Sequence, residues 1–157
     1  MPKRTPIRPV VPADVAALKT LVDTTLFPAD LLDDMIAPYL AGASDIWLAH
    51  ERDGLPVAVA FCEAERMTEG TWNLLAIAVL PARQGAGVGA ALVRHLEALL
   101  AARGERVLIV ETSSLPAYDG ARRFYARLGF AEEARIRDFY AAGDDKVVFR
   151  KALAAAG

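Results

Sequence analysis

The chain contains 157 residues, of which 54% are hydrophobic and 24% are charged, and its formal net charge is −2. This composition is typical of a folded domain with a sizeable core, and it excludes an intrinsically disordered chain. We expect one domain over residues 1–157, with its folded core at residues 4–153. The lack of net positive charge argues against a nucleic-acid partner, because basic patches bind phosphate backbones.

Several features that would direct the chain to other compartments or to a metal are missing from the sequence. The basic start at residues 2–4 is not followed by the apolar segment of a signal peptide, and no run approaches about 18 apolar residues. Cys62 is the one cysteine, which excludes an internal disulfide and a cysteine metal cluster. His50 and His95 lack the spacing of metal ligands. We therefore expect a cytoplasmic protein with no metal and no membrane partner.

Hydrophobic periodicity in the first half of the chain predicts two helices among strands. The expected elements are a strand at 4–10, helices at 14–22 and 28–40, and strands at 46–51 and 56–63. Pro6 and Pro9 restrict the first strand to an edge position, and Pro38 is expected to kink or end the second helix. The Asp53-Gly54 pair between the two later strands predicts a tight hairpin.

The second half of the chain continues the alternation of strands and helices. The expected elements are a strand at 72–79, a helix at 89–103, a strand at 106–112, a helix at 121–128, and strands at 134–140 and 146–151. The strand at 106–112 is apolar through its middle, as expected when both faces of a sheet are covered. The pattern predicts an α/β fold, a mixed sheet flanked by helices.

A glycine-rich segment at residues 84–92, QGAGVGAAL, lies between an expected strand and an expected helix. Free N–H groups at a helix start attract anions, and glycines let a phosphate approach the backbone closely. The dinucleotide pattern G-x-G-x-x-G fails because its third glycine is missing, and the nucleotide P-loop fails because no lysine follows. The segment predicts a phosphate-bearing ligand, with a plain structural loop as the alternative.

Two motifs together resemble the GCN5-related N-acetyltransferase (GNAT) superfamily. Residues 84–89 read Q-x-x-G-x-G, similar to the pyrophosphate-binding signature of that family. Residues 121–130 are similar to its A-x-x-x-Y-x-x-x-G-F block, with Gly129 at the position of a helix C-cap. The resemblance spans residues 7–153. It implies a mostly antiparallel mixed sheet with splayed fourth and fifth strands, and acetyl-CoA as cosubstrate.

In such a protein the pantetheine arm lies between the splayed strands, and the glycine turn holds the pyrophosphate. The resemblance implies main-chain contacts from Ile77 and Val79 to pantetheine, and N–H donation from residues 85–90 to the pyrophosphate. Tyr118 occupies a position that is often asparagine in the family, where it contacts the cofactor or simply packs. The implied cofactor-binding residues are Ile77, Ala78, Val79, Gln84, Gly85, Ala86, Gly87, Val88, Gly89, Ala90, Tyr118 and Tyr125.

The chemistry implied by the resemblance is direct attack of an amine on the acetyl thioester. The backbone N–H near Ile77 would polarise the thioester carbonyl. Tyr125 matches the usual general acid, a phenol that protonates the leaving thiolate. Helical spacing alone favours a core tyrosine at this position, since Tyr125 lies on the apolar face of its helix.

The general base is not fixed by the resemblance. Some members carry a glutamate on the fourth strand, and that position is Asn73 here, which cannot act as a base. Glu111 is the candidate base, with Glu63 and Glu65 as substitutes. A carboxylate acting through water, or no dedicated base, are the alternatives, and a solvated surface charge is the simplest explanation for each carboxylate.

The acceptor is expected to be a small-molecule primary amine. A protein amine or an aminoacyl-tRNA is the alternative acceptor, and a non-catalytic acyl-CoA-binding sensor is the alternative function. Acidic residues near the second helix (Asp30, Asp33 and Asp34) fit the helix dipole and could also attract a cationic amine. Homodimers are common in the family, and the sequence leaves that assembly open.

Overall fold

The computed structural model describes residues 6–154 and divides into two compact units. The first unit contains the described part of Met1–Glu63 together with Leu75–Leu99, and the second contains Ala64–Leu74 and the described part of Leu100–Gly157. The expected single domain over 1–157 stays a prediction. Residues 4–5 of the first expected strand lie outside the described residues.

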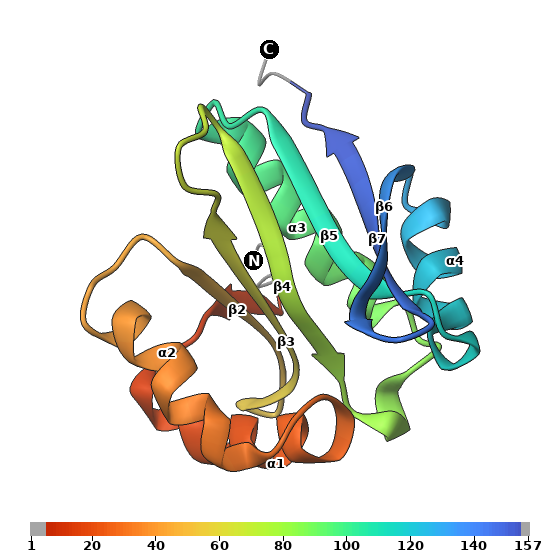
Figure 1. Ribbon diagram of the computed structural model, residues 1–157. Coiled ribbons are helices and arrows are strands. Elements are labelled where there is room, and N and C mark those ends of the chain that lie inside the picture. The colour runs from red at the N-terminus through yellow and green to blue at the C-terminus, as the bar shows by residue number, and fades with distance from the viewer. Residues whose placement is uncertain (1–5, 155–157) are drawn as a thin grey trace. The chain divides into compact units, whose positions relative to one another are not determined.

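The first unit contains three antiparallel strands and the N-terminal helices (Figure 1). Its elements are β1 Ile7–Pro9, α1 Val15–Thr25, α2 Leu32–Leu40, β2 Ile46–Arg52, nearly all of β3 Leu55–Ala64, the second half of β4 Thr71–Val79, and most of α3 Val88–Ala102. Short 3₁₀ turns at Pro12–Asp14, Ala29–Leu31 and Pro81–Arg83 precede α1, α2 and the glycine segment. The strand order is β1-β2-β3-β4, which confirms β1 as an edge strand.

The predicted hairpin between β2 and β3 is confirmed. Arg52 pairs with Leu55, so only Asp53 and Gly54 form the turn. Their φ angles are 54° and 80°, both in the left-handed region. Glycine and aspartate tolerate this conformation, and a two-residue turn of this kind matches the twist of the strands that it joins.

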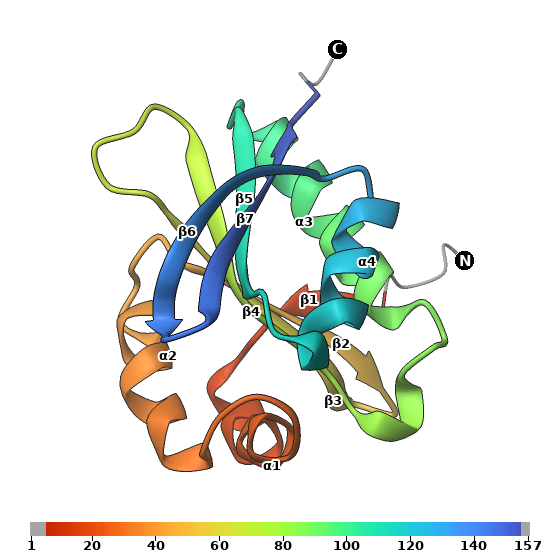
Figure 2. The same cartoon turned by 45° about the vertical axis from the view of Figure 1, so that its right-hand side comes forward.

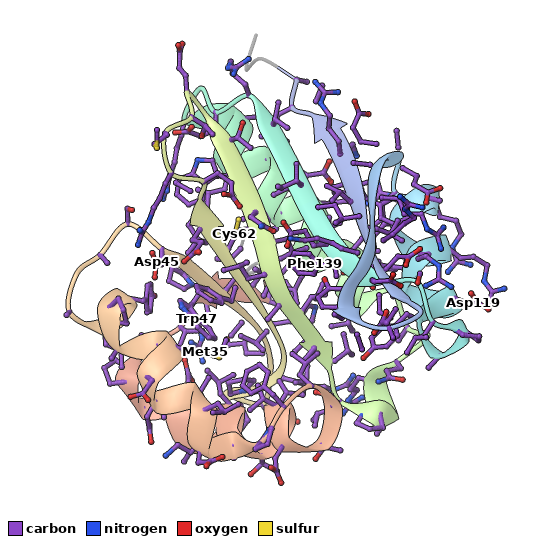
Figure 3. All side chains as sticks on the ribbon, in the orientation of Figure 1. Met35, Asp45, Trp47, Cys62, Asp119 and Phe139 are labelled. Atoms are coloured by element: carbon purple, nitrogen blue, oxygen red, sulfur yellow. The ribbon has the colours of Figure 1, made fainter. Side chains whose placement is uncertain are left out.

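The core of the first unit forms where α1 and α2 pack on the strands. It contains the stacked rings of Trp47 and Phe61, with centroids 4.2 Å apart, and Met35 of α2 packs against it (Figure 3). The helical spacing that predicted the two helices also supplies their buried faces. The helix residues in this core are Leu18, Leu21, Val22, Leu32 and Ile36.

The second unit contains the first half of β4, β5 Val107–Ser113, the short 3₁₀ turn Pro116–Tyr118, α4 Asp119–Arg127, β6 Ala131–Ala141 and β7 Asp144–Ala152. The strand order is β4-β5-β7-β6, and β6 and β7 form a long, curved hairpin beside α4 (Figure 2). The β4–β5 pair is parallel, with a register from Thr71↔Val107 to Leu74↔Val110, whereas β5–β7 and β6–β7 are antiparallel. The expected α/β fold with a mixed, mostly antiparallel sheet is confirmed.

The structure confirms that Gly129 ends α4. Its φ is 92°, a conformation that glycine adopts without the penalty of a Cβ. The N–H of Gly129 donates to the Ala126 carbonyl, and the N–H of Phe130 donates to the Tyr125 carbonyl, both at 3.1 Å. This tight turn directs the chain from the tyrosine helix into β6.

Element boundaries differ from the sequence expectation where local geometry interrupts the pattern. The expected helix 28–40 begins as a 3₁₀ turn, and regular α-helix starts only at Leu32. Pro38 lies inside α2, and the helix ends two residues later. Strand β6, Ala131–Ala141, is longer than the expected 134–140, and it contains two register irregularities and a left-handed residue, Asp138.

A partly buried ion pair, between Arg8 and the buried carboxylate of Asp14, anchors β1 to the start of α1. The Asp14 carboxylate accepts two hydrogen bonds from Arg8, at 2.7 and 2.9 Å, and one from the Val11 N–H at 2.9 Å. The bonds from Arg8 are the main cause that lowers the pKa of Asp14, and the Val11 bond adds to it. A depressed folded-state pKa stabilises the fold above the unfolded-state pKa, and this stabilisation is lost as the pH falls through the folded-state pKa.

We predict that Asp14→Asn lowers the free energy of unfolding by about 1–3 kcal/mol at neutral pH, because charged hydrogen bonds to a buried group are lost. The difference from the unchanged protein should shrink at acidic pH. Urea unfolding at both pH values measures it. Lys19→Met, which breaks the exposed Lys19–Asp33 pair, is the control and should cost less than about 1 kcal/mol. An equal loss at neutral and acidic pH would contradict the role of the Asp14 charge.

Candidate active site

The glycine segment forms an open turn before α3. Gly85 and Gly87 have φ angles of 82° and 79°, which favour glycine. A Cβ built on either residue would meet no atom within 4 Å. The need for glycine here is therefore conformational, and the space beside the turn is free of protein atoms. A ligand can approach this backbone closely.

The first turn of α3 presents backbone donors at the end of this glycine segment. The Ala91 N–H donates to the Gly87 carbonyl at 3.0 Å, so the N–H groups of Val88, Gly89 and Ala90 precede the first helical hydrogen bond. The helix dipole gives these groups positive character, which favours a phosphate. The backbone of this segment therefore has the geometry that an anion site requires, and binding of a phosphate there stays a prediction.

The side chain of Gln84 ties the glycine turn to the end of β4. Its Nε2 donates to the Val79 carbonyl at 3.1 Å. Of the three β4 residues predicted to contact the cofactor, Ile77 and Val79 are half-buried, and Ala78 is 4% exposed and packs in the core of the first unit. Contacts from Ala78 to a ligand must therefore come from its main chain.

Tyr125 lies in an aromatic cluster of the second unit. Its ring centroid is 5.2 Å from that of Phe124, 5.9 Å from Phe130 and 5.8 Å from Phe149. Burial raises the pKa of Tyr125 to about 12, so its phenol keeps its proton at neutral pH. Within residues 6–154 its hydroxyl makes no hydrogen bond, which leaves the proton available to a ligand. Tyr118, at the start of α4, is 47% exposed.

Asn73 connects the candidate base to a second carboxylate. Its Nδ2 donates to Glu65 Oε1 at 2.8 Å and contacts Glu111 Oε1 at 3.4 Å. The other carboxylate oxygen of Glu111, Oε2, is 2.9 Å from Lys146 Nζ. Lys146 in turn lies 4.0 Å from the centroid of the Phe139 ring. We call Glu65, Asn73, Glu111 and Lys146 the amide-bridged cluster.

The amide-bridged cluster is assembled by strands of the second unit. Glu65 follows the end of β3, Asn73 lies on β4, Glu111 on β5 and Lys146 on β7. Sequence reasoning considered Glu65 and Glu111 separately and did not foresee that Asn73 would bridge them. The substitute Glu63 is half-buried on β3 and belongs to the first unit.

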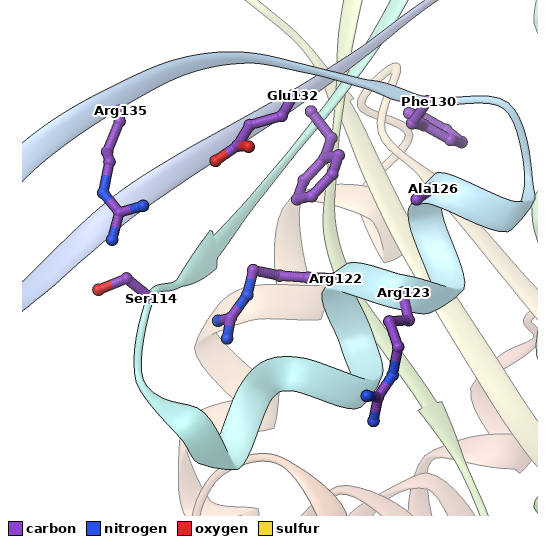
Figure 4. Close-up of a pocket in the computed structure, with 8 residues that line it drawn as sticks. Ser114, Arg122, Arg123, Ala126, Phe130, Glu132 and Arg135 are labelled. Atoms are coloured by element: carbon purple, nitrogen blue, oxygen red, sulfur yellow. The ribbon is translucent and has the colours of Figure 1, made fainter.

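A pocket of about 430 Å³ in the second unit was not predicted (Figure 4). It lies between α4 and β6, and its lining residues are Ser114, Arg122, Arg123, Ala126, Phe130, Glu132, Arg135 and Phe149. Arg122 pairs with Asp119 and donates to the carbonyls of Ser113 and Leu115. Arg122 therefore holds the end of β5 against α4 and has little capacity left for a ligand.

Residues 6–154 contain no group of three His, Cys, Asp or Glu side chains arranged to hold a metal ion. Over the same residues, no helix has the length and apolar character needed to cross a membrane. Cys62 is buried as a free thiol, and burial raises the pKa of that thiol, which keeps it protonated and unreactive.

Comparison with known proteins finds a matching family model and several similar structures. The acetyltransferase (GNAT) domain model matches residues 42–132. A GNAT-family protein from Desulfovibrio desulfuricans has a similar structure, with a TM-score of 0.89 and 33% sequence identity over 94% of this chain and 98% of that one. The ribosomal-protein-S18-alanine N-acetyltransferase of Escherichia coli shares the fold, with a TM-score of 0.79 and 24% identity over 96% and 95% of the two chains.

A curated relative is the GCN5-like protein acetyltransferase of Mycobacterium tuberculosis. It is 36% identical over 101 residues, which cover 63% of this chain and 44% of the relative. The match to this chain therefore spans less than half of that protein.

We predict that Gly87→Ala weakens binding of acetyl-CoA, because the new Cβ enters the space beside the turn and strains the cradle. The matched control is Gly54→Ala in the β2–β3 hairpin, where φ is 80° and the Cβ also meets no atom. Both variants should lose a similar free energy of unfolding, about 1–2 kcal/mol, from the left-handed backbone. Calorimetric titration should show weaker binding only for Gly87→Ala. Equal affinities in the two variants would contradict a cofactor role for this turn.

Proposed function

The chain belongs to the GNAT acetyltransferase superfamily, and from this membership we propose that it moves the acetyl group of acetyl-CoA to the primary amine of a small molecule. Acetyl-CoA is the cosubstrate of this family. The observation that carries the proposal is the turn before α3, where glycines with left-handed φ angles leave open space beside unpaired helical N–H groups.

In the proposed complex, main-chain groups of the protein bind acetyl-CoA. Donation from the N–H groups of Val88, Gly89 and Ala90, with the turn residues 85–87, holds the pyrophosphate. Main-chain groups at residues 77–79 pair with the amides of pantetheine, and Tyr118 adds a side-chain contact. The bond from Gln84 to Val79 supports this proposal indirectly, because it fixes the turn relative to the end of β4.

The proposed reaction is a direct acyl transfer. The amine loses a proton, its nitrogen lone pair attacks the thioester carbonyl carbon, and the developing oxyanion is stabilised by the Ile77 N–H. The C–S bond then breaks, and the thiolate takes the proton of the Tyr125 hydroxyl. The nitrogen, which is cationic after the attack, gives up its second proton to solvent, and an acetamide and CoA leave. Tyr125 recovers its proton from solvent. The Tyr125 phenol carries its proton at neutral pH, as a general acid must, although burial raises its pKa to about 12 and so lowers its acid strength.

We propose Glu111 as the base that receives the amine proton. Its Oε2 is held by Lys146 at 2.9 Å, whereas its Oε1 has only the 3.4 Å contact with Asn73, longer than an ordinary hydrogen bond. Oε1 is therefore the oxygen with a lone pair to offer. The ion pair fixes the orientation of the carboxylate, which a general base requires.

A protein amine is the second candidate acceptor. The curated relative from Mycobacterium tuberculosis is a protein acetyltransferase, and its identity of 36% over 101 residues favours this acceptor. An assay with both a panel of small primary amines and peptides with free N-termini or lysines separates the two acceptors. Release of CoA thiol with the small amines alone supports the first proposal, and release with peptides alone supports the second.

We also propose that the reaction takes place in the cytoplasm. The buried free thiol of Cys62 fits a reducing compartment. Localisation of a tagged protein by fractionation tests this proposal.

We predict that Tyr125→Phe lowers kcat by about 10²–10⁴-fold, the usual contribution of a general acid, and leaves acetyl-CoA affinity nearly unchanged. Thiol release in the presence of the best amine measures kcat. Tyr39→Phe is the matched control, because the Tyr39 hydroxyl donates to the Val10 carbonyl in the first unit and has no proposed catalytic role. Full activity of Tyr125→Phe would remove the acid role and leave Tyr125 as a core residue.

A further inference from the structure

The amide of Asn73 is oriented by the two carboxylates beside it. Carboxylate oxygens accept hydrogen bonds, so the atom that contacts both Glu65 and Glu111 must be the amide nitrogen. The amide oxygen, Oδ1, is bonded to the same carbon. Glu65 and Glu111 therefore fix Asn73 in one orientation, with an acceptor atom next to the pair of carboxylates.

Asn73 Oδ1 is a buried acceptor without a hydrogen-bond partner in residues 6–154. The residue is only 3% exposed, and burying an unpaired acceptor costs free energy unless a donor reaches it. An N–H or O–H donor from a ligand would satisfy this oxygen.

The charges of the amide-bridged cluster do not cancel. Glu65 and Glu111 carry two negative charges, and Lys146 supplies one positive charge, which leaves one net negative charge. Lys146 is held in place by Glu111 and by the Phe139 ring, so it cannot also neutralise Glu65. The Glu111 side chain is 28% exposed and Glu65 is half-buried, so both carboxylates reach solvent, whereas the Asn73 side chain is buried.

A primary ammonium group matches this cluster in both charge and hydrogen bonding. It carries one positive charge and three N–H donors. The cluster offers one net negative charge and three acceptors, namely Asn73 Oδ1, Glu65 and Glu111 Oε1. A neutral hydroxyl of the same size offers one donor and no charge, so it would leave the cluster charged and partly unpaired.

We infer that Glu65 and Asn73 bind the acceptor as a cationic primary ammonium beside Glu111. This inference rests on the proposed function and deepens it. Asn73 Oδ1 and the Glu65 carboxylate accept two of the N–H groups, and the third faces Glu111 Oε1, which takes that proton. The neutral amine then attacks the thioester. The acetamide product carries no charge, so it loses the ionic attraction that held the substrate, which favours its release.

The experiment is an NMR titration of ¹⁵N-labelled protein with n-butylammonium, with n-butanol as the neutral probe of similar size. The side-chain amide signals of Asn73 should shift and saturate with the ammonium probe but not with the alcohol. Glu65→Gln keeps the shape of the side chain and should weaken ammonium binding about tenfold or more, since it removes a charged hydrogen bond. Asn73→Leu should do the same.

Glu133→Gln is the matched control, because Glu133 is an exposed carboxylate of β6 outside the cluster. It should leave ammonium affinity within about twofold of the unchanged protein, as expected for a screened surface charge. Backbone amide spectra show whether each variant is folded. If Asn73→Leu does not fold, the ammonium affinity of Glu65→Gln alone decides the result. Unchanged affinity in Glu65→Gln, or an equal response to n-butanol, would overturn the inference.

Titration of the same samples with acetyl-CoA separates this inference from the proposed function. If acetyl-CoA binds and the Asn73 side-chain signals do not shift with n-butylammonium, the inference is wrong and the proposed acetyltransferase function is still supported. If the Asn73 signals respond as predicted but acetyl-CoA does not bind, the proposed function fails and the ammonium site stands as a binding site alone.

Discussion

The unpaired N–H groups at the start of α3 are the constraint on which this account depends. The first N–H groups of a helix have no partner within the helix. No neighbouring side chain accounts for the glycines of the turn before α3, because a Cβ on Gly85 or Gly87 would meet no atom within 4 Å. Gly85 and Gly87 adopt left-handed conformations in open space, so the turn exposes backbone instead of covering it. The bond from Gln84 to the Val79 carbonyl then fixes the turn at the end of β4. We propose that the pyrophosphate of acetyl-CoA, the cosubstrate of the family, completes this arrangement.

In the second unit, Asn73 of β4 lies beside two carboxylates, those of Glu65 and Glu111. Asn73 cannot take a proton, yet it holds Glu65 at 2.8 Å and approaches Glu111 at 3.4 Å. Lys146 orients Glu111 and offsets one of the two carboxylate charges. With asparagine at this position of β4, the region still contains two carboxylates. The proposed base and the proposed ammonium site both follow from this one bridged amide.

Local signals in the sequence predicted much of the fold. The Asp53-Gly54 hairpin and the Gly129 helix end depend on the conformations of one or two residues, so they could be read directly from residue type. The family resemblance and the mixed sheet were also confirmed. The amide-bridged cluster could not be predicted, because Asn73 and Glu111 lie 38 positions apart and meet only through the β4–β5 register. The α4–β6 pocket likewise depends on the curvature of a hairpin. The roles of Tyr125, Ile77 and Glu111 stay predictions.

The most direct test of this account is a calorimetric titration of the protein with acetyl-CoA, run beside CoA, ATP and NAD. We predict binding of acetyl-CoA and CoA with a dissociation constant on the order of 1 μM, which corresponds to about −8 kcal/mol, and no comparable binding of NAD or ATP. Absence of binding by both CoA species would contradict it, because the turn before α3 would then be a structural loop without a ligand.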